Sequence, residues 1–490
     1  MKHSRIFLTR VTFILIVVSF LEFNSQNLYA FQAYPHSEIT DKVDALFAQW
    51  DKVDSPGAAV GIFKDGRIIY ARGYGMANLE YNIPNTPQTV FRIGSTSKHF
   101  TAMCIALLIE KKKITDGDDI RLYIPELLKY GKAITIGNML HHTSGFRNYE
   151  ALMELAGRDG DTIKVPFYTD KDALDMIVRQ KKLNFSPGER YSYSNTNYFL
   201  LAEMVGRVSG MKTSDFAKKY MFEPLEMQST HFHDDINVIV KNRASGYSPK
   251  EGGGFRINMT QLEQIGTGSI YTTIEDLFKW DQNFYNNKLG LGRQSLIKMV
   301  ETPGALNNGV DIEYGFGLDV GAFYGLKLIS HGGSFVGFRS YYMRFPDQRF
   351  SIVILANQGP FPDYEIAGNI AILYLQDLFT EPLDKKQRTY RDREERSSLQ
   401  RIQLMPKQLE QYNGVYYSEE LDAYYTLYTE ANNLIMRVGR YYTAPLESVS
   451  LDEFRWNYGN VFFNRNSSGN VSGFFLNQDL IRDLDFRKIK

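Results

Sequence analysis

Strand-like runs lie at both ends of residues 58–356 and helical patterns fill the middle, and this order constrains the fold more than any other feature of the sequence. From about Thr115 to Gln282 the spacing of apolar residues is mainly helical. A sheet that is built from both ends of a segment, with helices inserted between, defines the α+β class. We therefore predict an antiparallel sheet flanked by helices, with an inserted helical subdomain and a closing helix at Ile366–Phe379. The runs that predict the strands of this sheet are Ala58–Phe63, Arg67–Tyr74, the run into Phe91, Leu326–Ser330, Gly337–Phe345 and Phe350–Ala356.

The sequence changes character after residue 382, and 490 residues are too many for one hydrophobic core. A dense mixed-charge run at 383–405 predicts a solvated linker. Beyond it, short aromatic and β-branched runs alternate with turn signals, which predicts a small antiparallel barrel of the lipocalin-like kind at 406–490. The main domain is then expected at 31–382.

The first 30 residues predict a secretory signal peptide. Lys2, Arg5 and Arg10 precede the apolar run Val11–Leu21, and polarity returns before a plausible cleavage site after Ala30. The apolar run is short for a membrane span, so an uncleaved anchor is the minor alternative. We expect an exported protein, periplasmic or extracellular, that meets a membrane only through this segment if it stays uncleaved.

Charge and cysteine content exclude several functions. The chain has 56 Lys and Arg residues against 56 Asp and Glu residues, so no basic surplus would drive binding to nucleic acid or to anionic membranes. The single cysteine, Cys104, cannot form an intramolecular disulfide. Because it lies within an apolar helical run, we expect an inert buried thiol.

A serine and a lysine stand three residues apart where an extended run enters the first apolar helix. On one helical face, Ser95 and Lys98 can approach hydrogen-bond distance. Desolvation would lower the pKa of the lysine, so that it could take the proton of the serine hydroxyl. The alternative is a capping serine followed by a solvated lysine. The same spacing recurs at Ser209 and Ser295, which we interpret as a helix end and a surface helix.

Two further stretches contain candidate site residues. Tyr193 and Asn195 lie two apart on a turn before a helix, so the phenol and the amide can point into one cleft. A tyrosine that anchors a turn through its hydroxyl is the structural alternative. His331 ends a strand-like run and is followed by two glycines, which would permit close approach of a ligand to the backbone. A tight bend with a structural histidine is the alternative there.

The second stretch also offers an oxyanion site. Gly332 and Gly333 precede Ser334, whose backbone N–H could join that of Ser95 in stabilising a developing negative charge. The histidine-rich run His231–Asp235 contains residue types that bind metals, but alternating histidines in a polar loop favour a surface position. We predict neither a metal nor a cofactor.

Together these motifs resemble the three active-site motifs of the serine β-lactamase and penicillin-binding-protein superfamily. The first is Ser95-x-x-Lys98, the second runs from Tyr193 to Asn195 and the third from His331 to Gly333. The likeness is closest to the class C-like branch, which includes D-aminopeptidases, D,D-carboxypeptidases and esterases. It covers about residues 40–380, and further similar stretches are Leu140–Phe146, Phe222–Met227 and Gly266–Leu277.

The resemblance implies roles for the site residues. Ser95 would form an acyl-enzyme, with Lys98 and Tyr193 sharing the duties of general base and general acid. Asn195 would orient the substrate amide or Lys98, and His331 would line the opposite wall. Which of Lys98 and Tyr193 takes the first proton stays open.

One departure from the family pattern bears on the substrate. Typical β-lactamases have Lys-Thr-Gly where this chain has His331-Gly332-Gly333, and a mostly neutral imidazole supplies less charge for a substrate carboxylate. The sequence therefore favours a peptidase or carboxypeptidase for D-amino-acid peptides, or an esterase, acting on a small-molecule or peptide substrate. The alternatives are a class C-like β-lactamase, a penicillin-binding or cell-wall-peptide sensor without turnover, and a binding protein that functions through its barrel.

Overall fold

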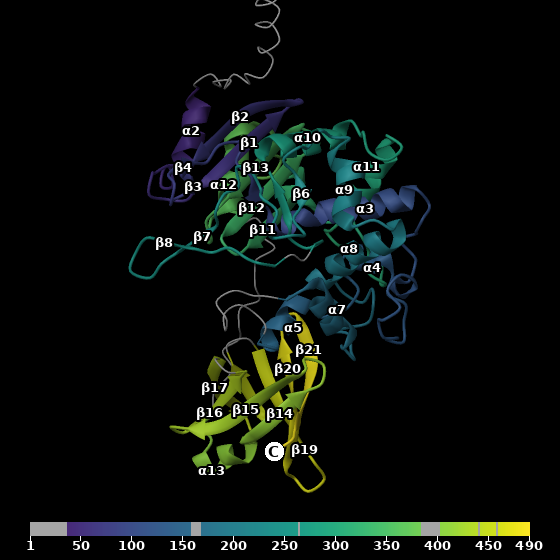
Figure 1. Cartoon of the computed structure of the whole chain (residues 1–490), viewed down its shortest axis with the longest axis vertical. Helices are drawn as coiled ribbons and strands as arrows, with labels where there is room; N and C mark the ends of the chain where they lie inside the picture. The colour runs from purple at the N-terminus through teal and green to yellow at the C-terminus, as the bar shows by residue number, and fades with distance from the viewer. Residues whose placement is uncertain (1–36, 158–167, 263–264, 384–401, 440–441, 457–458) are drawn as a thin grey trace, which may run out of the picture.

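The computed structural model describes residues 37–157, 168–262, 265–383 and 402–490, apart from 440–441 and 457–458. It consists of a main body of sheet and helices and a separate barrel formed by the last part of the chain (Figure 1). The predicted signal peptide and most of the predicted linker lie outside the described residues. Within the described part of the chain, no helix is long and apolar enough to span a membrane.

The main sheet has six strands in the order β10-β11-β12-β13-β1-β2, and neighbouring strands are antiparallel. It joins both ends of the main domain, because Ala58 in the first strand lies opposite Ala356 in the strand β13. This confirms the predicted α+β arrangement. The six strands are β1 (Ala58–Lys64), β2 (Arg67–Tyr74), β10 (Asp319–Phe323), β11 (Leu326–Phe335), β12 (Phe338–Phe345) and β13 (Phe350–Ala356).

The sheet is buried on both faces. Along β13, Ile352 and Ile354 point into one core and Val353 and Leu355 into the other, as expected for side chains that alternate along a strand. Helices α2 (Glu38–Phe47) and α12 (Asp363–Leu375) cover the first face, and α10 (Ile274–Tyr285) packs on the second (Figure 1).

Helix α3 (Lys98–Glu110) is the centre of the main domain. Its residues are buried from Lys98 to Leu108 on every side, which fits a helix that is apolar all round. It packs against α8 (Asn195–Ser209) and α11 (Gln294–Glu301), while the turn before it contacts β11. Within its described residues, the inserted subdomain also contains the helices α4 (Ile136–Leu140), α5 (Tyr149–Leu155), α7 (Asp170–Val178) and α9 (Thr213–Ala217).

Three details of the predicted strands are wrong. Strand β11 does not stop at Ser330 but continues through the histidine motif to Phe335, and β10 was not predicted. The run into Phe91 is only the short strand β5 (Phe91–Arg92), which pairs with β9 (Ile270–Thr272) outside the main sheet. The other short strands are β3 (Met76–Asn78), β4 (Ile83–Pro84), β6 (His231–Phe232), β7 (Tyr247–Pro249) and β8 (Phe255–Ile257).

The last part of the chain forms a closed eight-stranded barrel, which confirms the predicted all-β domain. Alternate side chains point inward and are largely aromatic; Phe474 stacks on Phe486 with ring centroids 4.4 Å apart. A short helix, α13 (Pro406–Leu409), precedes the barrel. Its strands are β14 (Gly414–Ser418), β15 (Ala423–Glu430), β16 (Asn433–Val438), β17 (Tyr442–Ser450), β18 (Glu453–Trp456), β19 (Gly459–Arg465), β20 (Val471–Gln478) and β21 (Ile481–Lys488).

The barrel contacts the main domain around one buried arginine. Arg147 precedes α5, and its guanidinium donates to Glu420 of the barrel at 2.7 Å and to the carbonyl oxygen of Arg482 at 2.6 Å. Both side chains of the Arg147–Glu420 ion pair are shielded from solvent. The carbonyl oxygen of Arg147 in turn accepts from Thr196 in α8, so this contact reaches the helix that follows Tyr193.

Removing one partner of this ion pair should weaken the attachment of the barrel. Glu420→Ala is expected to lower the stability of the protein by about 3 kcal/mol, because it leaves the Arg147 charge buried without its partner. Denaturant unfolding of the whole chain measures the loss. The neighbouring exposed pair between Lys181 and Glu419 supplies the control, and Glu419→Ala should cost less than about 1 kcal/mol. Equal losses from the two variants would contradict this account.

Candidate active site

Ser95 and Lys98 lie together where the backbone enters helix α3. Ser95 belongs to a 3₁₀ turn, Gly94–Ser97, that runs directly into the helix, and Lys98 Nζ is 3.1 Å from Ser95 Oγ. Lys98 is fully buried, and this burial lowers its pKa to about 7, against a smaller opposing effect of the Glu150 carboxylate. A neutral amine at this distance can accept the proton of the serine hydroxyl.

The other two Ser-x-x-Lys sequences do not form such a pair. Gly210, with φ of +70°, ends helix α8 directly after Ser209, and Lys212 beyond it is exposed. Ser295 and Lys298 lie on the exposed side of the amphipathic helix α11. Both observations agree with the interpretation of these copies as a helix end and a surface helix.

Aromatic rings and one carbonyl group surround the Lys98 amine. Its Nζ donates to the carbonyl oxygen of Thr267 at 3.0 Å and lies 4.9 Å from the centre of the Tyr193 ring and 5.7 Å from that of Tyr198. The second motif is thus next to the first, as the sequence predicts. The carbonyl of Thr267 belongs to a stretch that was noted only for its family likeness.

His142 positions the turn that contains Tyr193. Its ring lies 4.3 Å from the Tyr193 ring, and its Nδ1 accepts from the backbone N–H of Ser194 at 3.1 Å and from Asn197 Nδ2 at 3.0 Å. A histidine directly before a Thr-Ser-Gly turn would ordinarily satisfy backbone groups of that turn. His142 instead accepts hydrogen bonds from a segment about fifty residues further along the chain. The local sequence contains no signal for this tertiary contact.

Asn195 contacts a residue that the sequence did not single out. Its Nδ2 donates to Glu150 Oε2 at 2.6 Å, and its Oδ1 is buried without a hydrogen-bond partner. Glu150 is the second residue of α5, where an acidic side chain is usual at a helix N-terminus. Burial raises the pKa of Glu150, while Lys98 and Asn195 act in the opposite direction. The carboxylate is therefore part of the site, although its sequence position suggested an ordinary helix start.

His331 is a neutral hydrogen-bond acceptor on the far wall. Its Nδ1 lies 2.7 Å from the Gly332 carbonyl oxygen, which requires the proton on Nδ1, so Nε2 accepts from the Tyr314 hydroxyl at 3.1 Å. Burial, with a contribution from Lys98, lowers the pKa of His331 to about 3. Its ring centroid is 6.5 Å from that of Tyr193. The imidazole therefore supplies no positive charge at neutral pH.

The glycines of the third motif let strand β11 run against the nucleophile turn. A Cβ on Gly333 would lie 1.9 Å from the carbonyl oxygen of Ile93, and one on Gly94 would lie 2.9 Å from the backbone nitrogen of Ser334. Ser334 is thus beside the turn that contains Ser95. This close approach is the arrangement that a pair of oxyanion donors on Ser95 and Ser334 requires.

Replacing Gly333 by alanine tests the packing of β11 against the turn that contains Ser95. Gly333→Ala is expected to reduce activity at least about 100-fold, the effect of displacing one oxyanion donor, because the strand must move away from Ile93. Gly332→Ala is the matched control, since the nearest neighbour of its Cβ would be the Tyr341 ring, at 3.3 Å. The hydrolysis rates of the two folded variants are measured on the same substrate and compared. Equal activity of the two would remove β11 from the proposed oxyanion site.

The histidine-rich run is not the surface loop that we expected. His231 belongs to the short strand β6 and stacks on Tyr271, and His233 is buried. Burial is the main cause that lowers the pKa of His233 to about 4. Among the described residues, no group of three or more His, Cys, Asp or Glu side chains is arranged to hold a metal ion.

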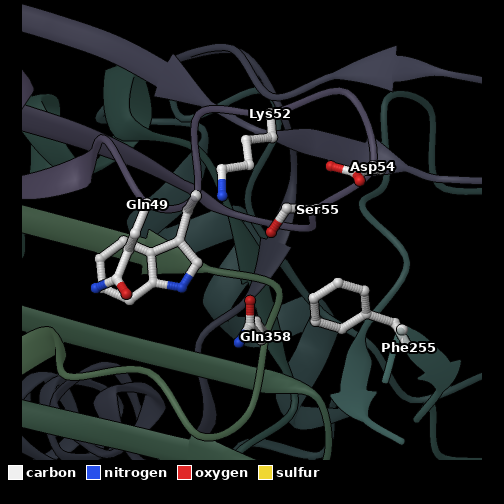
Figure 2. A pocket seen from close by; sticks show the side chains of 8 residues that line it. Gln49, Lys52, Asp54, Ser55, Phe255 and Gln358 are labelled. Atoms are coloured by element: carbon white, nitrogen blue, oxygen red, sulfur yellow. The ribbon is translucent and has the colours of Figure 1, made fainter. Parts of the chain in front are cut away.

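A hollow of about 320 Å³ lies elsewhere on the main domain (Figure 2). It is formed by the segment after α2, the start of β8 and Gln358, which follows β13. It includes none of the motif residues and is therefore separate from the Ser95 site. The labelled side chains around it are Gln49, Lys52, Asp54, Ser55, Phe255 and Gln358.

The sheet with its inserted helices and the pair of Ser95 with the buried Lys98 define the class to which β-lactamases and penicillin-binding proteins belong. Residues 43–376 match the family model described as Beta-lactamase, and the chain belongs to this family. A similar protein is the D-aminopeptidase of Gluconobacter oxydans (strain 621H), which is 28% identical over 303 residues. The match covers 62% of this chain and 56% of that relative, so the chain spans little more than half the length of the relative.

Solved structures share the fold. The octameric penicillin-binding protein homologue from Pyrococcus abyssi matches with a TM-score of 0.61 at 24% identity, over 92% of this chain and 100% of that one. A D-stereospecific amidohydrolase from Streptomyces sp. matches with a TM-score of 0.56 at 20% identity, over 69% of this chain and 99% of that one. The first likeness extends over most of the chain.

Proposed function

We propose that the protein is a serine hydrolase that cleaves amide or ester bonds of D-amino-acid substrates through an acyl-enzyme on Ser95. The observation on which this depends most is the 3.1 Å contact between Ser95 Oγ and the buried Lys98 amine. The names of the similar proteins, D-aminopeptidase and D-stereospecific amidohydrolase, support the substrate class.

The reaction begins when the Ser95 hydroxyl loses its proton and Oγ attacks the substrate carbonyl carbon. Lys98 and Tyr193 are the two candidate proton acceptors, and Lys98 Nζ lies 3.1 Å from Oγ. The negative charge that forms on the carbonyl oxygen is stabilised by the N–H groups of Ser95 and Ser334. The leaving amine or alcohol takes up a proton, and water then hydrolyses the ester and restores Ser95.

Turnover of β-lactams is the less favoured alternative. A substrate carboxylate would need a positive side chain on the His331 wall, and the imidazole there is neutral. We therefore propose that an uncharged or positively charged acyl group suits the site better than an anionic one.

Initial rates on a small substrate panel test the proposed function. D-alanine p-nitroanilide, its L-enantiomer, p-nitrophenyl acetate and a chromogenic cephalosporin cover the amide, ester and β-lactam alternatives. The proposal expects ester cleavage and a preference for the D-amide. Turnover of the cephalosporin alone would make the protein a β-lactamase instead.

We also propose that the protein is exported, with cleavage after Ala30, on the basis of the basic and apolar pattern of its first residues. Expression of the full chain in a bacterial host, followed by fractionation and N-terminal sequencing, tests this. Mature protein that begins at Phe31 outside the cytoplasm is the expected result, and uncleaved protein in the cytoplasm would contradict it.

A further inference from the structure

The hollow beside the end of β13 takes no part in the reaction steps described above (Figure 2). Its volume of about 320 Å³ lies at the lower end of the range of about 300–1,000 Å³ that small-molecule sites occupy. Its side chains come from separate parts of the chain: the segment after α2, the start of β8 and the residue after Asn357. Because segments distant in sequence form it together, the chemistry of its lining indicates which ligand it fits.

A buried acceptor without a partner lies in this hollow. Gln358 is 8% exposed, and its Oε1 has no hydrogen-bond partner among the described residues. Figure 2 shows this oxygen directed toward Ser55, with the Phe255 ring to one side. The backbone around Gln358 is held in place, because Tyr247 exchanges two 3.0 Å hydrogen bonds with the residues on either side of it. Buried acceptors without a donor are uncommon and indicate a ligand or water.

Two further polar groups of the lining are acceptors. Ser55 Oγ donates its proton to the carbonyl oxygen of Pro56 at 2.7 Å, so it can only accept from a ligand. The carboxylate of Asp54 likewise accepts. A matching ligand must therefore supply several O–H or N–H donors. Lys52 and Asp54 have opposite charges, so the lining gives no net attraction to a cation or to an anion.

Two aromatic side chains form the apolar part of the lining. Trp50 is buried, and its ring centroid lies 4.4 Å from that of Phe361, which fixes the indole. Phe255 is half-buried at the start of β8, where it pairs with Pro249. Aromatic rings attract the C–H groups of a ligand through dispersion and through their negative faces. The hollow therefore combines apolar walls with acceptors for hydroxyl groups.

We propose that this hollow binds a neutral saccharide, independently of acylation at Ser95. A sugar ring has an apolar C–H face for an aromatic wall and a rim of hydroxyl groups. These hydroxyls can donate to Gln358 Oε1, Ser55 Oγ and the Asp54 carboxylate. An anion such as phosphate suits the hollow less well, because it has few protons to donate and is repelled by Asp54.

A free amino acid is the competing ligand. Its ammonium and carboxylate groups could pair with Asp54 and Lys52. Both of these side chains are exposed, however, and ion pairs in contact with water contribute little. The buried acceptor of Gln358 is the stronger constraint, and it requires a donor rather than a charge.

Isothermal titration calorimetry of the protein tests the proposal. The saccharide probes are N,N′-diacetylchitobiose and maltose, and D-phenylalanine represents the amino acids. We expect at least one saccharide to bind, and Gln358→Leu to weaken that binding at least about 10-fold, because a ligand hydroxyl loses its acceptor. The variant should fold, since it removes a buried acceptor that has no partner. Phe255→Ala, which removes a half-buried wall, should also weaken binding.

The matched control is Gln348→Leu. Gln348 also has a buried Oε1 without a partner in the described part of the chain, but it lies before the start of β13 and outside the hollow. This variant should bind the saccharide as the wild type does. Ser95→Ala should also keep wild-type binding, and Gln358→Leu should keep the wild-type rate on p-nitrophenyl acetate, because the two sites share no residue.

Three outcomes would overturn the proposal. The first is that neither saccharide binds. The second is equal binding by the wild type and Gln358→Leu, which would place the saccharide elsewhere. The third is binding of D-phenylalanine alone with a loss in Gln358→Leu, which would make the hollow an amino-acid site. Because none of these measurements uses hydrolysis at Ser95 to detect the ligand, the proposed function is tested separately.

Discussion

Ser95→Ala is expected to abolish acylation and to lower hydrolysis of every accepted substrate by at least about 10⁴-fold, since no other atom replaces the attacking oxygen. The change removes one hydroxyl from a turn whose backbone stays in place. Circular dichroism and thermal unfolding should therefore match the wild type. Single-turnover rates with p-nitrophenyl acetate measure the loss.

The two other Ser-x-x-Lys sequences provide controls for that experiment. Ser209→Ala and Ser295→Ala should keep wild-type rates, because their lysines are exposed and face solvent. A comparable loss in either variant would mean that the wrong serine has been assigned. Wild-type acylation of Ser95→Ala would have the same meaning.

Lys98→Met is expected to slow acylation by about 10²- to 10⁴-fold, the usual effect of removing a general base. Methionine is close to lysine in length and suits a fully buried position, so the fold should persist. Because the pKa of Lys98 is about 7, the wild-type acylation rate should fall as the pH drops below 7 and the amine becomes protonated. The variant should lack this pH dependence. Rapid acylation by Lys98→Met would assign the base to Tyr193 instead.

Stability against pH gives an independent check on Lys98. In the unfolded chain a lysine holds its proton up to about pH 10.4, whereas in the folded protein the amine loses it near pH 7. Between these values the unfolded state binds more protons, so the free energy of unfolding should rise with pH in this window. Lys98→Met should remove this contribution, and denaturant unfolding at pH 7 and pH 9 measures the difference.

The sequence predicted the architecture because each element has its own local signal. The nearly continuous apolar runs Ala58–Phe63 and Phe350–Ala356 and the apolar run after Lys98 each specify an element without reference to the rest of the chain. The extension of β11 through Gly332 and Gly333 was missed, because glycines in a strand lack a side-chain pattern. Their close contact with Ile93 is visible only in the folded structure.

Only part of the candidate site was predicted, because only some of its residues belong to local sequence motifs. Ser95, Lys98 and Tyr193 were found through motif spacing, and the structure brings them together. Glu150 and His142 depend on hydrogen bonds to Asn195 and Ser194, which are distant in sequence. An acid at a helix start and a histidine in a turn have ordinary local explanations, so no signal in one sequence marks them.

The contact between the barrel and the main domain could not be predicted from the sequence either. Arg147 is one of many arginines, and its contact with Glu420 joins residues that are 273 positions apart. Because Arg147 also accepts from Thr196 beside Asn195, the structure connects the barrel to the site. The barrel therefore contacts a residue that is hydrogen-bonded to the helix after the second motif.

The central claim is that Ser95 forms the acyl-enzyme, and intact-mass spectrometry with peptide mapping tests it most directly. The protein is mixed with p-nitrophenyl acetate or a fluorescent penicillin, quenched in acid within the first turnover and digested. A single adduct on the peptide that contains Ser95, absent from Ser95→Ala, is the predicted result. Full turnover of the ester with no adduct on Ser95, or an adduct on another residue that persists in Ser95→Ala, would contradict the account.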